Sequence, residues 1–116
     1  MIVNWIKCEG QQWCNFKNLN LDHSHFNNLE GVYIIWHGSP NAAVVRIGQG
    51  NIRERLKAHK QDPDILKYEN LGLYTTWAEV VSTYREGIER HLAEKWKPKV
   101  GARFPKVPAI EVNSPW

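Results

Sequence analysis

The sequence has no long apolar run, because no window approaches the roughly 18 to 20 consecutive apolar residues that a membrane-spanning helix needs. Its first residues, MIVNWIKCEG, lack the basic start and the apolar stretch of a secretory signal peptide. We therefore expect a cytoplasmic protein without a membrane partner.

Cysteine is scarce as well, with 2 in 116 residues. Cys8 and Cys14 are too few for a disulfide framework, so we expect free thiols. With His23 and His25 they offer four zinc ligands close together in the sequence. Their spacing differs from that of familiar zinc modules, however, and free thiols with surface histidines are the preferred interpretation.

The composition is otherwise that of a folded globular domain, with 42% hydrophobic and 23% charged residues. A chain of 116 residues can bury one hydrophobic core, and no repeat, low-complexity tract or linker divides it. We expect a single domain over residues 1–116. The net charge of +3 favours an anionic partner.

Residue patterns predict an α+β fold with a central three-stranded antiparallel sheet flanked by helices. An irregular N-terminal segment precedes this core, and an extended, proline-containing tail follows it. The predicted elements are a short opening strand (2–6), a hairpin (31–37 and 43–47), a helix capped by Asn51 that ends at 59 or 60, a helical turn (62–68), a third strand (71–81) and an amphipathic helix (83–98).

Strand alternation places Tyr33 on the face of the sheet opposite to Val32 and Ile34. On the amphipathic helix, a stripe of apolar residues at intervals of four predicts the buried side; it consists of Tyr84, Ile88, Leu92 and Trp96. Glu89 follows Ile88 and is therefore expected at the edge of this stripe, partly hydrated.

A glycine pair, Gly48 and Gly50, leads directly into a helix start rich in cations. Backbone N–H groups at a helix start favour phosphate, and so do guanidinium groups. A dinucleotide loop needs a third glycine where this chain has Arg53, and the Gly-Lys-Ser/Thr of a nucleoside triphosphate loop is absent. Taken alone, the glycines are better explained by a strand-to-helix turn than by a phosphate site.

The wider pattern resembles the GIY-YIG nuclease family. GVY at 31–33 matches the first signature strand, and RIG at 46–48 matches the second, with Arg46 where the family usually has a tyrosine. Arg55 falls at the family's catalytic arginine, and Glu89 in EGIERHLAEKWKP falls at its metal-binding glutamate. The resemblance covers about residues 29–100 and implies a GIY-YIG-like domain.

The resemblance implies a site for phosphodiester hydrolysis. Tyr33 would be the general base, provided that a nearby cation lowers its pKa, and Arg55 would grip the phosphate. Glu89 would hold one Mg²⁺ or Mn²⁺, an ion that often takes a single protein carboxylate. His59, one helical turn from Arg55, would relay a proton or hydrogen-bond to Tyr33.

Five further residues are expected to contact the substrate. One belongs to the glycine pair, three flank it, and the fifth is the asparagine nearest to one that the family commonly carries after its glutamate helix; they are Gly48, then Arg46, Arg53 and Lys57, and Asn113. Trp13 and Trp116 are candidates for stacking on a base, although core packing explains them equally well.

We therefore expect an endonuclease that hydrolyses DNA, with RNA left open as a substrate and the oligomeric state undetermined. Two alternatives stay open. Arg46 could mark a nucleic-acid-binding domain of the same fold that has lost catalysis, or the chain could be an interaction protein without a nucleic-acid role.

Overall fold

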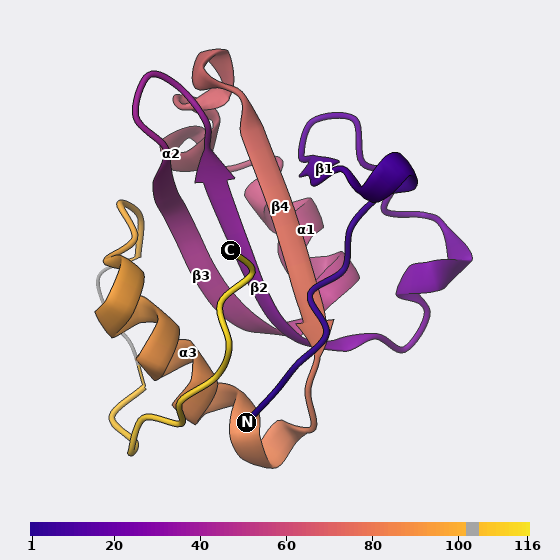
Figure 1. Cartoon of the computed structure of the whole chain (residues 1–116). Helices are drawn as coiled ribbons and strands as arrows, with labels where there is room; N and C mark the ends of the chain where they lie inside the picture. Colours follow the sequence, from indigo (N-terminus) through magenta and orange to yellow (C-terminus); the bar gives the residue numbers. More distant parts are fainter. Residues whose placement is uncertain (102–104) are drawn as a thin grey trace.

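The computed structural model describes residues 1–101 and 105–116. Its strands form one antiparallel sheet in the order β1-β4-β2-β3, with helices on both faces (Figure 1). The strands are β1 (Cys14–Asn15), β2 (Glu30–His37), β3 (Ala43–Asn51) and β4 (Leu73–Glu79), and the helices are α1 (Ile52–His59), α2 (Pro63–Leu66) and α3 (Ser82–Trp96). The α+β class is confirmed.

The sheet in the described part of the chain has a fourth strand that the sequence patterns did not predict, the two-residue β1 at the outer edge of β4. The predicted strand at 2–6 is wrong. The end of that segment is hydrogen-bonded to β4, where Ile6 N donates to Trp77 O (2.9 Å). Earlier in the segment, Val3 exchanges hydrogen bonds with the Asn113 side chain, so its backbone groups are satisfied without a strand partner.

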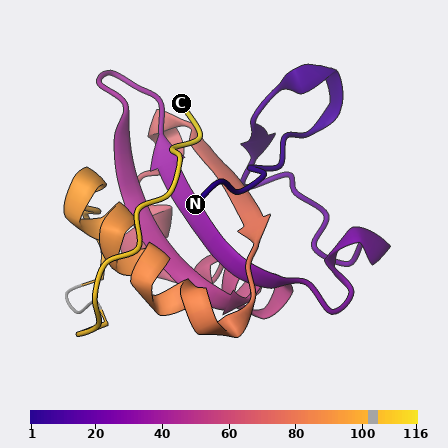
Figure 2. The same cartoon turned by 60° about the horizontal axis from the view of Figure 1, so that its bottom comes forward.

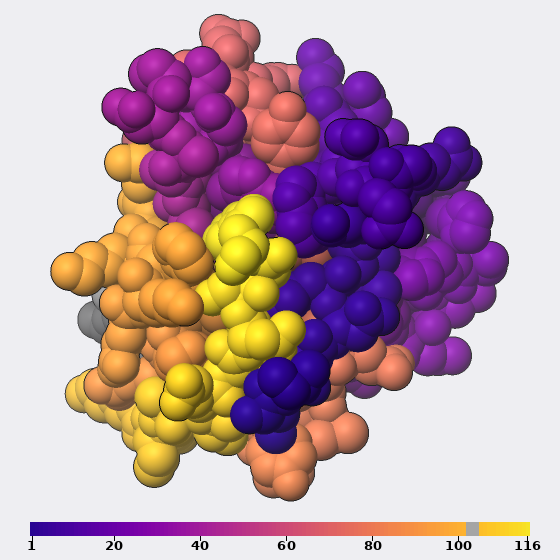
Figure 3. Space-filling view, viewed as in Figure 1, coloured from indigo at the N-terminus to yellow at the C-terminus, as the bar shows by residue number. Residues whose placement is uncertain are grey.

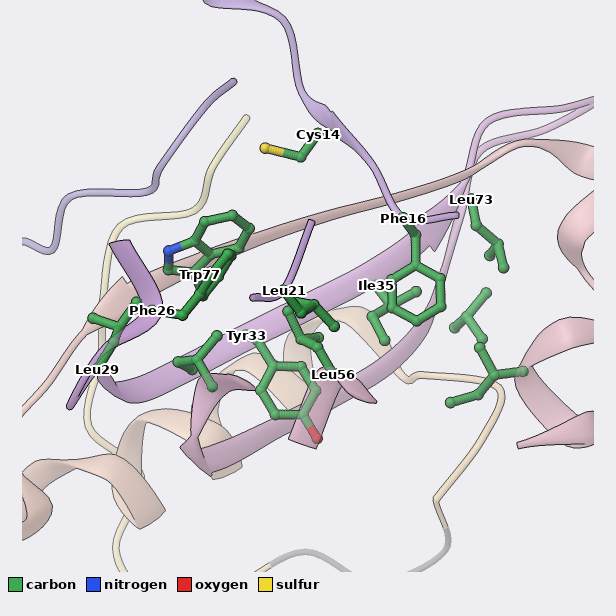
Figure 4. Close-up of a cluster of buried hydrophobic side chains, with 13 residues drawn as sticks. Cys14, Phe16, Leu21, Phe26, Leu29, Tyr33, Ile35, Leu56, Leu73 and Trp77 are labelled. Carbon is green, nitrogen blue, oxygen red and sulfur yellow. The ribbon is translucent and has the colours of Figure 1, made fainter. Parts of the chain in front are cut away.

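The predicted hairpin of β2 and β3 is present, and its register places Tyr33 opposite Gly48. The predicted alternation is also confirmed, because the two faces of β2 enter separate hydrophobic clusters. Tyr33 and Ile35 pack with α1, whereas Val32 and Ile34 pack with α3. Figure 4 shows the first cluster, in which the Tyr33 ring lies beside Leu56 of α1.

Both long helices were predicted, with one error in the buried stripe of α3. Asn51 caps α1 as expected, since its side chain accepts a hydrogen bond from Glu54 N (3.0 Å). On α3, Ile88 and Leu92 are buried, but Tyr84 is 43% exposed. Residues four apart advance about 40° beyond a full turn at each step, so a stripe with this spacing drifts out of the interface.

The C-terminal tail runs beside the N-terminal segment across the face of the sheet that carries α3 (Figures 2 and 3). The Met1 amino group donates to Glu111 O, and Trp5 Nε1 donates to Asn113 O (2.8 Å). Up to residue 101, the chain after α3 also follows the outer edge of β3, where Val100 N donates to Val45 O (2.8 Å). The hydrogen bond between Val100 and Val45 places the start of the tail next to the RIG motif at residues 46–48.

Cys8 and Cys14 form a disulfide, so the expectation of free thiols is wrong. The turn between them contains Gly10 and Gln11, both at positive φ, which brings the two cysteines together. Disulfides persist in oxidising compartments, and a cytoplasmic location therefore stays an expectation only. None of the helices within residues 1–101 and 105–116 has the length and apolar character needed to cross a membrane.

Candidate active site

Tyr33 lies at the centre of β2 on the α1 face and is only 1% exposed. Its hydroxyl lies 2.5 Å from Nε2 of His59, the last residue of α1, so the predicted contact between these side chains is present. In Figure 4 the hydroxyl projects from the lower edge of the apolar cluster, away from the other labelled side chains. The phenol is thus held by packing along its ring and by the polar contact with His59 at its tip.

Gly48 makes room for this arrangement. A Cβ built on Gly48 would overlap the Tyr33 hydroxyl and ring, so no larger residue fits opposite Tyr33 without a shift. Gly48 is itself buried. Its role in the structure is therefore to accommodate the phenol, and the structure does not present it as a substrate contact.

Arg55 extends from the first turns of α1 and is exposed. Its side chain folds towards Gly50, where a Cβ would lie 3.2 Å from Arg55 Nε. Gly50 has a φ of 129°, a conformation that other residues rarely adopt. The second glycine of the pair thus provides both the turn and the space for the guanidinium.

Glu89 is half-buried on α3, at the edge of the buried stripe as expected. Burial, with a smaller contribution from the nearby charge of Glu86, raises the pKa of its carboxyl from 4.5 to about 7. The positive charges of Arg46 and Arg55 act in the opposite direction on this pKa. Glu89 therefore shares one electrostatic environment with both arginines.

Arg46, like Arg55, lowers the pKa values of Tyr33, His59 and Glu89. It projects from the edge strand β3 and lies against Gly101, where a Cβ would be 2.6 Å from its Nη1. Arg46 Nε is buried and has no hydrogen-bond partner within residues 1–101 and 105–116. A buried donor without a partner is costly, and an anion bound beside it would remove that cost.

The protonation states of Tyr33 and His59 follow from burial. Burial raises the pKa of the Tyr33 hydroxyl above its usual value near 10, although Arg46 and Arg55 oppose this shift. The role of Tyr33 as a general base was expected to require a nearby cation that lowers its pKa. In the unliganded protein the net shift of this pKa is upward, so that requirement is not met. Burial and the two arginines lower the pKa of His59 to about 4, so its imidazole is neutral at pH 7.

Two cationic side chains of α1 that were expected to contact the substrate bind the N-terminal segment instead. Arg53 donates to Leu21 O (2.7 Å) and also binds His23 O and Asn27 Oδ1. Lys57 forms an exposed ion pair with Asp22. Residues 53 and 57 are four apart and share one face of α1, so they hold the N-terminal segment while Arg55 and His59 face the candidate site.

Asn113 is also placed away from this group. Its side chain accepts from Val3 N (2.7 Å) and donates to Val3 O (3.0 Å), and its carbonyl accepts from Trp5 Nε1. Its amide thus joins the two ends of the chain, on the face of the sheet opposite to Tyr33. The prediction that Asn113 contacts substrate has no support in the structure.

The metal ligands available at the site are few. The described part of the chain contains no cluster of three or more His, Cys, Asp or Glu side chains suited to a metal. Cys8 and Cys14 are joined to each other, and His25 Nε2 faces Trp77 Nε1 (3.1 Å), so the zinc quartet does not form. Glu89 alone suits Mg²⁺ or Mn²⁺, which fill most positions with water and substrate oxygens.

Two features of the site were not predicted from the sequence. Glu86 lies three residues before Glu89 on α3 and raises its pKa, and helical spacing alone could have revealed this neighbour. Gly101 lies against Arg46, but its position depends on how the chain after α3 returns to β3. No local pattern predicts that return.

Searches of protein-family models, curated proteins and solved structures found no match to this chain.

Proposed function

We propose that this protein is a metal-dependent endonuclease of the GIY-YIG type that hydrolyses DNA phosphodiester bonds. The main support is that five chemically active side chains from four elements act on one another electrostatically. They are Tyr33 of β2, Arg46 of β3, Arg55 and His59 of α1, and Glu89 of α3. A phenol, a carboxylate and two guanidinium groups are the groups that phosphodiester hydrolysis uses to move protons, hold a cation and offset negative charge.

The arginines would bind the scissile phosphate. Arg55 is exposed and can approach two phosphate oxygens with parallel N–H groups. The unpaired Arg46 Nε would gain an acceptor from the same phosphate. An arginine in place of the family's second tyrosine thus adds positive charge where the transition state becomes more negative.

Tyr33 and His59 would move the proton. As water attacks phosphorus and the bond to the leaving oxygen breaks, Tyr33 accepts a proton from the water and passes its own proton to His59 Nε2, while the leaving oxygen takes up a proton from solvent. The 2.5 Å contact provides this route. A bound phosphodiester offsets the arginine charges that help to lower the pKa of His59, which makes the imidazole a better acceptor in the complex than in the free protein.

Glu89 would hold the metal ion. A cation beside it replaces the hydration that the carboxylate loses by burial, so the residues fit one ion with a single protein ligand. When bound, Mg²⁺ or Mn²⁺ supplies Lewis-acid stabilisation of the phosphoryl oxygens.

Plasmid nicking tests this proposal. Wild-type protein with Mg²⁺ or Mn²⁺ should convert supercoiled plasmid to open circles, and Glu89→Gln should abolish this while retaining DNA binding. Glu94→Gln is the matched control, because it removes the same charge from the exposed side of α3, where Glu94 pairs with Arg90. Equal nicking by wild type and Glu89→Gln would overturn the metal role of Glu89.

The second candidate is a nucleic-acid-binding domain that does not cut, and the burial of Tyr33 favours it. A phenol that is 1% exposed with a raised pKa must become more accessible before it can accept a proton from water. Salt-dependent DNA binding without nicking in Mg²⁺ or Mn²⁺ would support this alternative. Absence of DNA binding at low salt would leave only an interaction protein without a nucleic-acid role.

A further inference from the structure

An apolar groove of about 260 Å³ lies where the β2–β3 hairpin meets the end of α3. Three tryptophans and three small or branched residues line it: Trp36, Ala42, Ala43, Val44, Trp96 and Trp116. Trp116 is 49% exposed, and Ala42 is exposed as well. The groove thus offers aromatic surface that is open to a guest.

The three tryptophans are arranged to receive a planar ring. Trp116 stands at 89° to Trp36 and at 81° to Trp96, with ring centroids 5.0 Å apart in both pairs. A flat guest that stacks on Trp116 would therefore lie nearly perpendicular to the planes of Trp36 and Trp96. Offset stacking and edge-to-face contact are the two arrangements that aromatic groups prefer.

Positive charge borders this apolar surface. Lys95 Nζ lies 5.4 Å from the centroid of the Trp96 ring and donates to Ser114 Oγ (2.9 Å). The exposed Lys99 follows the edge of β3, where its N–H donates to Val44 O (3.2 Å). An aromatic groove with cations at its rim suits a guest that combines a flat base with a phosphate chain.

The groove is continuous with the candidate active site along β3. Val44 lines the groove. The next residue, Val45, accepts a backbone hydrogen bond from Val100. Arg46 then lies against Gly101. From Val44 to Gly48 the strand advances about 13 Å, at roughly 3.3 Å per residue. That length spans at most about four nucleotides, the number that fits at the 3.4 Å rise of a duplex strand, and an extended single strand spans it with fewer.

We propose that this groove binds an unpaired nucleobase of single-stranded DNA, within about four nucleotides of the phosphate held at Arg46 and Arg55. The inference rests on the nucleic-acid binding proposed above and adds a substrate class to it. In a duplex both faces of each base are covered by neighbouring bases, so only an unpaired base can stack here. The protein therefore prefers DNA with a single-stranded segment over a fully paired duplex.

The test uses two fluorescent 12-mers of equal charge, one of thymidines and one of abasic sugar phosphates, in EDTA so that no cleavage occurs. Wild type should bind the thymidine strand about tenfold more tightly, as expected for one stacked base. Trp116→Ala should reduce this ratio to about one. Ala42→Leu, which fills the groove without removing a tryptophan, should do the same, whereas the matched control Tyr84→Ala, at an exposed aromatic outside the groove, should leave the ratio unchanged.

Equal binding of both strands by wild type would overturn this inference, and so would a preference that survives in Trp116→Ala and Ala42→Leu. The nicking assay separates the two proposals. If wild type nicks plasmid in a metal-dependent way but binds the thymidine and abasic strands equally, the groove proposal is wrong and the nuclease proposal stands. A base preference lost in both groove variants, without nicking, would support the groove and remove the nuclease.

Discussion

The hydroxyl of Tyr33 lies in the space that a side chain at residue 48 would need, and within 2.5 Å of His59 Nε2. Gly48 and His59 thus fix the phenol from two elements, the edge strand β3 and helix α1. The glycine of the RIG motif is therefore explained by the tyrosine of the GVY motif across the hairpin.

Gly48→Ala should destabilise the protein by about 1–3 kcal/mol, because the added methyl group overlaps a phenol that packing holds in place. Urea unfolding measures the change. Gly38→Ala is the control, since its methyl group would meet only the Tyr74 ring, at 3.2 Å, beside the exposed hairpin turn. Equal stability of Gly48→Ala and wild type would contradict the packing described for Tyr33.

Tyr33→Phe keeps the ring and removes the hydroxyl that faces His59. We expect nicking to fall about 10²- to 10⁴-fold, the usual contribution of a positioned acid–base group, with DNA affinity unchanged. Tyr68→Phe is the matched control, because Tyr68 stacks on His37 in another part of the α1-side cluster. A Tyr33→Phe variant that nicks as fast as wild type would show that the hydroxyl has no catalytic part.

Glu89, which is half-buried, and His59, which is buried, should make the free energy of unfolding depend on pH in opposite directions. The folded-state pKa of Glu89 is raised from 4.5 to about 7, so its contribution to stability is present below pH 4.5 and is lost as the pH rises to 7. The folded-state pKa of His59 is lowered from 6.5 to about 4, so stability is lost as the pH falls from 6.5 towards 4.

Single variants separate these two effects. Glu89→Gln should raise the free energy of unfolding relative to wild type more at pH 8 than at pH 4.5, while His59→Gln should be less sensitive than wild type to acidification below pH 6.5. Urea unfolding at four pH values measures both. If the free energy of unfolding changed with pH in the same way for wild type and for one variant, the burial assigned to the residue replaced in that variant would be contradicted.

Arg46→Gln should move the pH dependence of nicking to higher pH, because Arg46 lowers the pKa of Glu89 and its removal favours the neutral carboxyl. The slope of log affinity for DNA against log salt should also decrease by about one. Lys67→Gln, at the exposed C-terminal end of α2, controls for net charge. An unchanged salt slope in Arg46→Gln would argue against a phosphate contact at this position.

Local patterns predicted the elements that build the candidate site. Alternation placed Tyr33 on one face of β2, Asn51 marked the start of α1, and helical spacing placed Arg55 beside His59. Each of these depends on neighbours close in sequence, where backbone geometry fixes which side chains share a face.

Long-range packing decided what the patterns missed. Arg53 and Lys57 bind the N-terminal segment instead of facing a substrate, which depends on where a loop some thirty residues earlier in the chain comes to lie. Asn113 pairs with Val3 for the same reason. Long-range packing also determines how deeply Tyr33 is buried, and burial raises the pKa of its hydroxyl. Strand alternation alone predicts the face of the sheet on which Tyr33 lies but not the depth of its burial.

The most direct test of the account is the position of Mn²⁺, located by its anomalous scattering in crystals soaked with the ion and a short DNA strand. The account predicts one ion with a Glu89 oxygen among its ligands and a phosphate held between that ion, Arg46 and Arg55. An ion bound elsewhere, with Glu89 free and no phosphate near the two arginines, would contradict it.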